Sequence, residues 1–506
     1  MLHLSRLGCA LVLILSCAGC GAQQAGVPVD AAVGDTGGPG RDTGGNEDRA
    51  ADAPAPADAP ALTDASPPAD AAWADQPGIP CGDSLANVYG TPSLPALTPA
   101  ARGDVVRCAP DVTYDLSAVQ GQLSARGIAT PARSGAAIYR IAYRTTRGTG
   151  AAGVGTARVY LPAAPLPPPL PVIVVGHATS GLAASCAPSK DPTTNQDSAL
   201  PWAALGYAVI APDYAGLGND DPVQGYVDNR DTAYSVLDAA RALRKLLPAS
   251  ALSPQVLLQG WSQGGGAVLS AQALARAYGC DGTLAGVIVF AAEWPTRMNS
   301  FGYVAMLSNP TQLTIQTGIS NPVVAVLRQY AYSALYLGPT HATETFPAAK
   351  RTGIGGAVMS QCYLPLGGYL QGATPHVGDF LDETFRQTLL ACINGPVDGG
   401  PGCVDPGQSY HAFLTQNILT ADASGPPLLY VQGLLDYIMP AASEAACNLA
   451  KLQADGVTPQ VCVDPGAQHT DVVGRNQDFA MQWGQAVLQG APPPTCSAVG
   501  MPPCTP

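Results

Sequence analysis

The sequence is poor in charged residues, and basic residues are the scarcer kind. Only 12% of its 506 residues are charged, and 24 Lys and Arg stand against 37 Asp and Glu, so the formal net charge is −13. Because no cluster of Lys and Arg is present, the composition argues against a nucleic-acid partner and against binding to anionic lipid through a basic patch. Hydrophobic residues make up 47% of the chain, which is enough for a large core and excludes disorder throughout.

Motifs for metals and nucleotides are missing as well. The six His residues show neither an H-E-x-x-H motif nor a paired Cys/His spacing, so no metal and no cofactor are predicted. A formal G-x-G-x-x-G occurs at Gly148, Gly150 and Gly153. A strand pattern follows it, whereas dinucleotide binding needs a helix there. We therefore predict a β-hairpin at these glycines.

The apolar run near the N-terminus, Leu7–Leu15, is too short for a transmembrane helix. It follows Arg6 and precedes small residues, which predicts a secretory signal peptide over residues 1–20. Residues 21–80 consist almost entirely of Ala, Asp, Pro and Gly, and their Asp residues lack the spacing of a calcium loop. Such a segment cannot bury enough apolar surface to order itself, so we predict a disordered tether.

Two cysteines at the end of the signal peptide are candidate lipidation sites. Cys20 follows Ala18 and Gly19, as in a bacterial lipobox, and is preferred over Cys17. Gly21 does not indicate retention in the inner membrane. We therefore expect an exported lipoprotein of the outer membrane that touches the membrane through its lipid anchor alone, with secretion without a lipid as the alternative.

Eleven of the fourteen cysteines lie beyond Cys20, and in an exported protein most should form disulfides. Connectivity does not follow from sequence alone. The pairs expected from proximity are Cys81–Cys108, Cys392–Cys403, Cys447–Cys462 and Cys496–Cys504. If Cys20 is lipidated, the eleven cysteines that follow are an odd number, and one thiol stays unpaired. If Cys17 is the anchor instead, Cys20 joins them and the number of cysteines available for disulfides becomes even.

From residue 81 onward, strand patterns alternate with helix patterns. After a pair of strands at the hairpin, apolar strands are predicted at 170–177, 206–214, 254–260, 285–293, 426–433 and 459–466, and helices at 229–247, 264–279, 440–454 and 474–489. Apolar strands bounded by helices predict an α/β fold with a mostly parallel sheet covered on both faces. The stretch of about 295–424 lacks this rhythm and is expected to be an inserted cap in a domain spanning 81–490, followed by a Pro- and Cys-containing tail at 491–506.

Ser262 stands in the sequence Gly260-Trp-Ser-Gln-Gly264. A G-x-S-x-G motif is a weak signal in a chain with 57 glycines. Here, however, it lies between an apolar strand and a helix rich in Gly and Ala. This context is that of the nucleophile elbow of α/β-hydrolases, where a strained turn exposes the serine hydroxyl.

A serine nucleophile needs a base, and in this fold the order along the chain is Ser, Asp or Glu, His. Only His469 follows a late strand that bears an acid; the other histidines lie in the signal peptide, before the serine or in the insertion, at His3, His177, His341, His376 and His411. Asp436, in the turn after strand 426–433, is the predicted acid that orients the base. Asp464 and Asp471 are rival candidates for the acid. The structural alternatives are that Asp436 is an ordinary turn or helix-capping residue and that His469 is a surface histidine without a catalytic role.

Oxyanion donors are expected at two places. One is the backbone N–H of Gln263, directly after the nucleophile. The other should come from the loop 177–181, with Thr179 as first choice and Ala178 as alternative. His177 either orders this loop by hydrogen bonds or serves as a base.

Several segments resemble the secretory, lipase A-type family of α/β-hydrolases over about residues 85–490. They are GDVVRC (103–108), GHATSG (176–181), LGYAVIAPDYAGLG (205–218), GWSQGG (260–265), VQGLLDYIMP (431–440) and QHTDVV (468–473). The resemblance implies a serine esterase for triacylglycerols or other carboxylic esters, with a large helical cap. It implies Ser262, Asp436 and His469 as the triad, while Ala178 replaces a glycine of the family's usual H-G-T-T-G loop.

The predicted function is therefore cleavage of small-molecule or lipid esters through an acyl-enzyme. A peptidase or an acyltransferase would use the same triad. A surface-anchored binding or structural module on a hydrolase scaffold is the alternative from another class. It predicts the loss of a triad residue, yet all three are present.

Overall fold

The computed structural model describes residues 80–505 apart from 91–92, 164–167, 192–197, 220–222, 299, 301–302, 311–321, 374–375, 396–399 and 498. All of these residues belong to one unit, Ser66–Pro506. The predicted signal peptide, both candidate lipidation sites and nearly all of the predicted tether lie outside the described residues. Within the described ranges, none of the helices is both long and apolar enough to cross a membrane.

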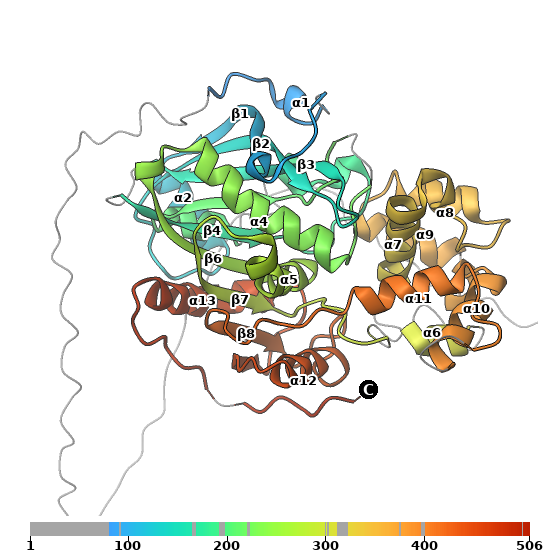
Figure 1. Cartoon of the computed structure of the whole chain (residues 1–506). Helices are drawn as coiled ribbons and strands as arrows, with labels where there is room; N and C mark the ends of the chain where they lie inside the picture. Colours follow the sequence, from blue (N-terminus) through green and yellow to red (C-terminus); the bar gives the residue numbers. More distant parts are fainter. Residues whose placement is uncertain are drawn as a thin grey trace, which may run out of the picture. The chain divides into compact units, whose positions relative to one another are not determined.

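A nine-stranded sheet forms the centre of the described part (Figure 1). Its strands are β1 (Val105–Tyr114), β2 (Ala136–Thr146), β3 (Ala152–Pro162), β4 (Leu170–Gly176), β5 (Ala208–Pro212), β6 (Leu252–Trp261), β7 (Thr283–Phe290), β8 (Leu428–Gly433) and β9 (Gln460–Asp464). Their order is β1-β2-β3-β5-β4-β6-β7-β8-β9. The pairs from β5 through β9 are parallel, and β1, β2 and β3 pair antiparallel, as does β3 with β5. The predicted mostly parallel sheet is confirmed.

Strands β2 and β3 form the predicted hairpin. Their register pairs Thr146 with Ala152, so the glycine-rich segment is the connecting turn. The sequence did not predict β1 or the helix α2 (Leu116–Ala125) that follows it. Residues of β1 vary irregularly among buried, half-buried and exposed, and its pairing with β2 contains two register shifts. This irregularity hides the period of two by which a strand is recognised.

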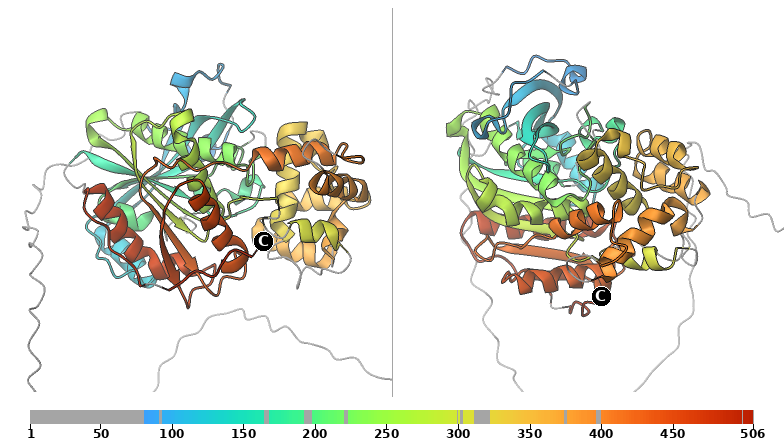
Figure 2. Two further views of the ribbon diagram at one scale, coloured as in Figure 1. Left: turned by 60° about the horizontal axis from the view of Figure 1, so that its bottom comes forward. Right: turned by 45° about the vertical axis from the view of Figure 1, so that its right-hand side comes forward.

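Helices cover both faces of the sheet (Figures 1 and 2). One face carries α4 (Asn229–Leu246), α5 (Gln263–Tyr278) and α12 (Ala446–Ala454); the other carries α2 (Leu116–Ala125), α3 (Leu200–Ala204) and α13 (Val472–Leu488). The helix α4 shows how local sequence sets the bounds. The Asp228 side chain accepts hydrogen bonds from the N–H groups of Arg230 and Asp231 and so caps its N-terminus. Its C-terminus comes just before Pro248, which cannot continue a helix.

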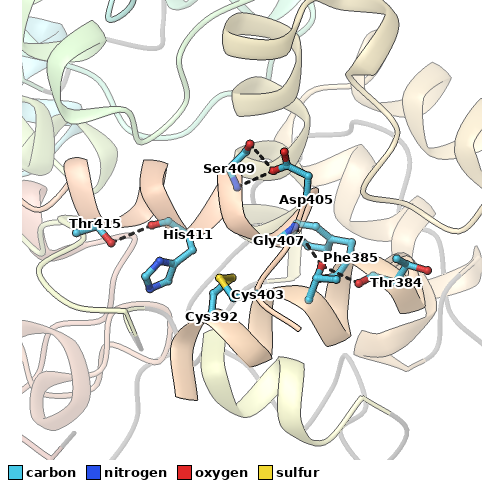
Figure 3. Close-up of a disulfide and its surroundings, with 10 residues drawn as sticks. Thr384, Phe385, Cys392, Cys403, Asp405, Gly407, Ser409, His411 and Thr415 are labelled. Atoms are coloured by element: carbon cyan, nitrogen blue, oxygen red, sulfur yellow. Dashed lines mark hydrogen bonds between the residues drawn. A yellow bond between two sulfur atoms is a disulfide. The ribbon is translucent and has the colours of Figure 1, made fainter. Parts of the chain in front are cut away.

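A helical cap lies between β7 and β8, at one side of the sheet (Figure 2). It consists of α6 (Tyr303–Ser308), α7 (Pro322–Tyr332) with its π-helical extension η6 (Ser333–Leu337), α8 (Arg351–Val358), α9 (Tyr363–Ala373), α10 (Glu383–Asn394) and α11 (Gly407–Gln416). The cap helices pack around a hydrophobic cluster, to which the sheet domain contributes Leu182, Tyr226, Val227 and Met439. A disulfide between Cys392 and Cys403 joins the end of α10 to the segment that leads into α11 (Figure 3).

Five disulfides are formed, and two of them match predicted pairs. The expected Cys392–Cys403 and Cys81–Cys108 bridges are present. The expected Cys447–Cys462 and Cys496–Cys504 bridges are wrong. The tail runs back along α12 and β9, so the partners are Cys447–Cys504 and Cys462–Cys496.

The fifth disulfide, Cys186–Cys362, joins the cap to the sheet domain across 176 residues. Among the cysteines of the described residues, Cys280 is the one that forms no disulfide. Disulfides persist in oxidising compartments, and five of them indicate an exported protein.

Candidate active site

Ser262 lies in a sharp turn between β6 and α5. Its φ is +55°, a conformation that non-glycine residues rarely adopt. Two glycines allow the strand and the helix to approach closely. A Cβ atom on Gly260 would lie 2.1 Å from the carbonyl oxygen of Gly264, and one on Gly264 would lie 2.2 Å from that of Gly176. The motif therefore forms the tight turn expected of a nucleophile elbow.

The side chains of Ser262, His469 and Asp436 form one hydrogen-bonded chain. His469 Nε2 lies 2.9 Å from Ser262 Oγ, and His469 Nδ1 lies 2.8 Å from Asp436 Oδ2. All three residues are at least 95% buried. They come from loops after three different strands, β6, β8 and β9. The structure thus brings together three residues that the sequence places up to 207 positions apart.

The carboxylate of Asp436 is held from both sides. Its Oδ1 accepts hydrogen bonds from the backbone N–H groups of Ile438 (2.9 Å) and Met439 (2.7 Å), so Oδ2 faces His469. The rival acids have other partners. Asp464 pairs with Arg475 at 2.8 Å, and Asp471 accepts from the backbone N–H of Gln468 at 2.6 Å.

The loop after β4 is ordered around a buried histidine. The two ring nitrogens of His177 face the carbonyl oxygens of Ala178 (2.6 Å) and Asp213 (3.2 Å), and its ring stacks on Tyr214 at 4.4 Å. Burial lowers the pKa of His177 to about 4, so the ring is neutral at ordinary pH. A neutral imidazole has one N–H, so it donates to one of these two carbonyl oxygens. This hydrogen bond and the stacking on Tyr214 support the interpretation of His177 as a residue that orders the loop.

Thr179, in the same loop, contacts two polar side chains from other segments. Its Oγ1 lies 2.9 Å from Tyr226 Oη and 3.1 Å from Glu293 Oε2, and Tyr226 Oη donates to Glu293. Burial is the main influence on Glu293 and raises the pKa of its carboxyl to about 7, although the hydrogen bonds from Tyr226 and Thr179 act in the opposite direction. Sequence reasoning missed Glu293. The available signal was an acidic residue three positions after the end of the apolar strand β7, at the edge of a parallel sheet where ligands bind.

Gln263 begins α5, so its backbone N–H is one of the amide groups that a helix N-terminus leaves without an intrahelical partner. The cap histidines lie elsewhere. His341 pairs with Glu344 and His376 with Asp379, and His411 lies on α11 near the Cys392–Cys403 disulfide (Figure 3).

A cavity of about 400 Å³ opens at Ser262 and His469. One part of its wall comes from loops at the sheet edge, including Thr179 and Glu293. The other part is mainly apolar and comes from the cap and from the segment after Asp436: Val324, Cys362, Tyr363, Leu364, Pro365, Ile438 and Met439. A cavity of this size suits a small molecule or one end of a larger chain.

Comparisons with known proteins agree with this arrangement. Residues 193–294, which include Ser262, match the family model of secretory lipases. The rice cell wall degrading esterase LipA from Xanthomonas oryzae is similar in structure, with a TM-score of 0.58 at 19% identity over 77% of this chain and 99% of that one. Candida antarctica lipase A in its closed state is also similar in structure, with a TM-score of 0.55 at 19% identity over 80% of this chain and 86% of that one. No curated protein matches the sequence.

The chain has an α/β-hydrolase fold, and residues 193–294 of it match secretory lipases. The predicted fold class and the predicted family resemblance are therefore confirmed. The match to secretory lipases supports an enzyme for carboxylic esters. The two solved structures are less than 25% identical in sequence to this chain. They therefore support the fold and do not indicate a particular ester substrate.

Proposed function

We propose that this hydrolase cleaves carboxylic esters with Ser262 as nucleophile, His469 as general base and Asp436 as the group that orients the base. The hydrogen-bonded chain Ser262–His469–Asp436, whose serine and histidine line the cavity, carries this proposal. His469 Nε2 removes the hydroxyl proton as Ser262 Oγ attacks the ester carbonyl carbon. Asp436 keeps the proton of His469 on Nδ1 and stabilises the imidazolium that forms.

The tetrahedral intermediate carries a negative oxygen that needs donors. The backbone N–H of Gln263 is one donor, and the second comes from the loop after β4, at Thr179 with Ala178 as alternative. His469 then donates its proton to the leaving alcohol, which gives an acyl-enzyme. A water molecule, activated by the same histidine, releases the acid and restores the serine.

The apolar cap wall supports a lipid or other apolar ester as substrate.

We further propose that the exported protein is anchored by a lipid on Cys20 or Cys17. Expression of the protein in the presence of a labelled fatty acid tests this anchor. If the label is lost in only one of the variants Cys20→Ser and Cys17→Ser, the cysteine replaced in that variant is the anchor. Label that persists in both variants contradicts lipidation at these two cysteines.

Labelling of the purified mature hydrolase with a fluorophosphonate tests the nucleophile, with the modified residue mapped by mass spectrometry. We expect modification at Ser262 and none in Ser262→Ala, together with a loss of ester hydrolysis of about 10⁶-fold in kcat. Ser270→Ala is a matched control, because Ser270 lies about two helix turns into α5 and its hydroxyl donates to the carbonyl of Gly266. A folded protein that neither labels nor cleaves esters, with or without detergent, contradicts the proposal and favours a binding module.

A further inference from the structure

Next to the nucleophile, three polar side chains form a closed triangle that the triad does not use. Thr179 Oγ1 and Tyr226 Oη lie 2.9 Å apart, Tyr226 Oη and Glu293 Oε1 2.9 Å, and Thr179 Oγ1 and Glu293 Oε2 3.1 Å. Tyr226 and Glu293 are almost fully buried. Thr179 is half-buried and lines the same cavity as Ser262. The backbone N–H of Glu293 donates to the carbonyl of Ser262 at 2.9 Å, which fixes the triangle relative to the nucleophile.

The number of hydrogens in this triangle depends on the charge of Glu293. When the carboxylate is ionised it only accepts, so the hydroxyl hydrogens of both Tyr226 and Thr179 point at it. When the carboxyl is protonated, it donates to Tyr226, and Tyr226 donates to Thr179 Oγ1. The hydroxyl hydrogen of Thr179 then serves only the longest contact of the triangle, to Glu293 Oε2 at 3.1 Å. Because that acceptor is now a neutral carboxyl, which binds a hydrogen less strongly than a carboxylate does, the hydrogen can turn toward the cavity and give up this one contact.

We propose that Glu293 is a positioning residue that, when protonated, frees the Thr179 hydroxyl to donate a hydrogen bond to the carbonyl oxygen of an ester held at Ser262, and that withdraws this donor when ionised. The proposal rests on the ester hydrolysis proposed above. The hydroxyl adds a donor to the backbone N–H groups of the oxyanion site. No proton passes to the substrate, because Glu293 only exchanges a proton with solvent.

Charged and titratable groups from every neighbouring element act on Glu293. Burial and the Glu444 carboxyl of η9 (Ala441–Ala445) raise the pKa of Glu293, whereas Tyr226, Thr179 and Arg328 of α7 lower it. Tyr214, beside the loop after β4, also feels its charge. Because burial outweighs the lowering influences, the pKa lies at about 7, and both forms are populated near neutral pH.

The pH dependence of catalysis follows from these two forms. The extra donor is present below pH about 7 and is lost as the pH rises through the pKa of Glu293. His469, across the cavity, acts in the opposite sense, because it must be neutral to accept the serine proton. The wild-type rate should therefore fall on the alkaline side, where a lone Ser-His-Asp triad would reach a plateau.

The test is the pH profile of kcat/KM between pH 5 and 9 with p-nitrophenyl butyrate, read at the isosbestic wavelength of nitrophenol. A single oxyanion donor is worth about 10²–10³-fold in kcat, so we expect an additional one to make the wild-type rate fall about tenfold or more above pH 7. Glu293→Gln carries amide hydrogens at every pH, so its alkaline fall should disappear. Thr179→Val should be slow below pH 7 and flat above it, while Thr179→Ser should keep the fall.

Glu444→Gln is the matched control, because it removes a neighbouring buried carboxyl outside the triangle. It should move the midpoint of the fall to lower pH and leave its size unchanged. If Glu293→Gln and Thr179→Val both cleave the ester with the wild-type alkaline fall, the proposal is overturned. If the wild type neither cleaves the ester nor reacts with fluorophosphonate at Ser262, the proposed function itself fails, which is a distinct result.

Discussion

The sheet edge and the cap contribute to the active site in different ways. Ser262, Asp436 and His469 follow the carboxyl ends of strands β6, β8 and β9, and parallel strands bring these ends to one edge. Thr179 and Glu293 follow β4 and β7 at the same edge. The polar groups to which we assign chemistry therefore all come from the sheet domain.

The cap supplies a different kind of residue. Its contributions to the cavity are mainly apolar, such as Val324 on α7 and Leu364 and Pro365 on α9. One of its attachments to the sheet domain lies beside the oxyanion loop, where Cys362 bonds to Cys186 and the backbone N–H of Tyr363 donates to the carbonyl of Ser180 at 2.9 Å. The difference suggests that the sheet determines the reaction and the cap determines the fit of the substrate. This division can be tested with one change at the sheet edge and two in the cap.

The largest effect is expected from Asp436→Asn at the sheet edge. The amide keeps the shape and can still accept the two backbone hydrogen bonds, but it cannot hold the proton of His469 on Nδ1. We expect kcat to fall by about 10⁴-fold, with little change in KM, measured with a soluble ester.

The control is Asp464→Asn, since Asp464 is also acidic and near His469 in sequence but pairs with Arg475. Its kcat should stay within about twofold of the wild type, because exposed ion pairs contribute little. A large loss of kcat in Asp464→Asn together with a small loss in Asp436→Asn would show that Asp464, and not Asp436, is the acid of the triad.

A smaller effect is expected from removing the disulfide that joins the cap to the oxyanion loop, with Cys186→Ser and Cys362→Ser combined. A misplacement of about 1 Å near the reacting atoms costs about 10²-fold, so kcat/KM should fall by about 10- to 100-fold. The bridge closes 176 residues, and the chain-entropy model gives up to about 5 kcal/mol of lost stability. Denaturant unfolding monitors this loss.

The second cap disulfide is the control for that experiment. Cys392–Cys403 closes only 11 residues and lies within the cap (Figure 3). Replacing both of its cysteines with Ser should lower the stability by about 3 kcal/mol and leave kcat/KM of the folded protein unchanged. Equal losses of kcat/KM for the two bridges would contradict a special role of the attachment point.

The same division separates what the sequence predicts well from what it predicts poorly. Buried parallel strands are continuous apolar runs, and each was found within a few residues of its observed bounds. The cap helices were not predicted individually, because their sequences carry signals against helix. The helix α8, for example, contains Gly353, Gly355 and Gly356, and glycine disfavours a helix interior. Such helices form because the cap core buries one side of them, which no local pattern encodes.

The candidate site divides in a similar way. Ser262 lies in a local motif, and the chain order of the fold then leaves few choices for its partners. Glu293 has no such marker, because its role depends on Thr179, 114 residues away. The tail disulfides were mispredicted for the same reason, since proximity in sequence does not reveal that the tail returns along α12 and β9.

The smallest effect is expected from changing the size of Val324 in the cap wall. Val324→Phe should exclude part of a long acyl chain, and Val324→Ala should admit more of it. One buried methylene is worth about 0.8 kcal/mol, or about fourfold, so the ratio of kcat/KM for octanoate over butyrate esters should move about fourfold in opposite directions. Val404→Phe is the control, because Val404 is an exposed residue of the cap. A ratio that stays constant in both Val324 variants, with kcat retained, would show that the acyl chain lies against the sheet loops and that the cap does not select it.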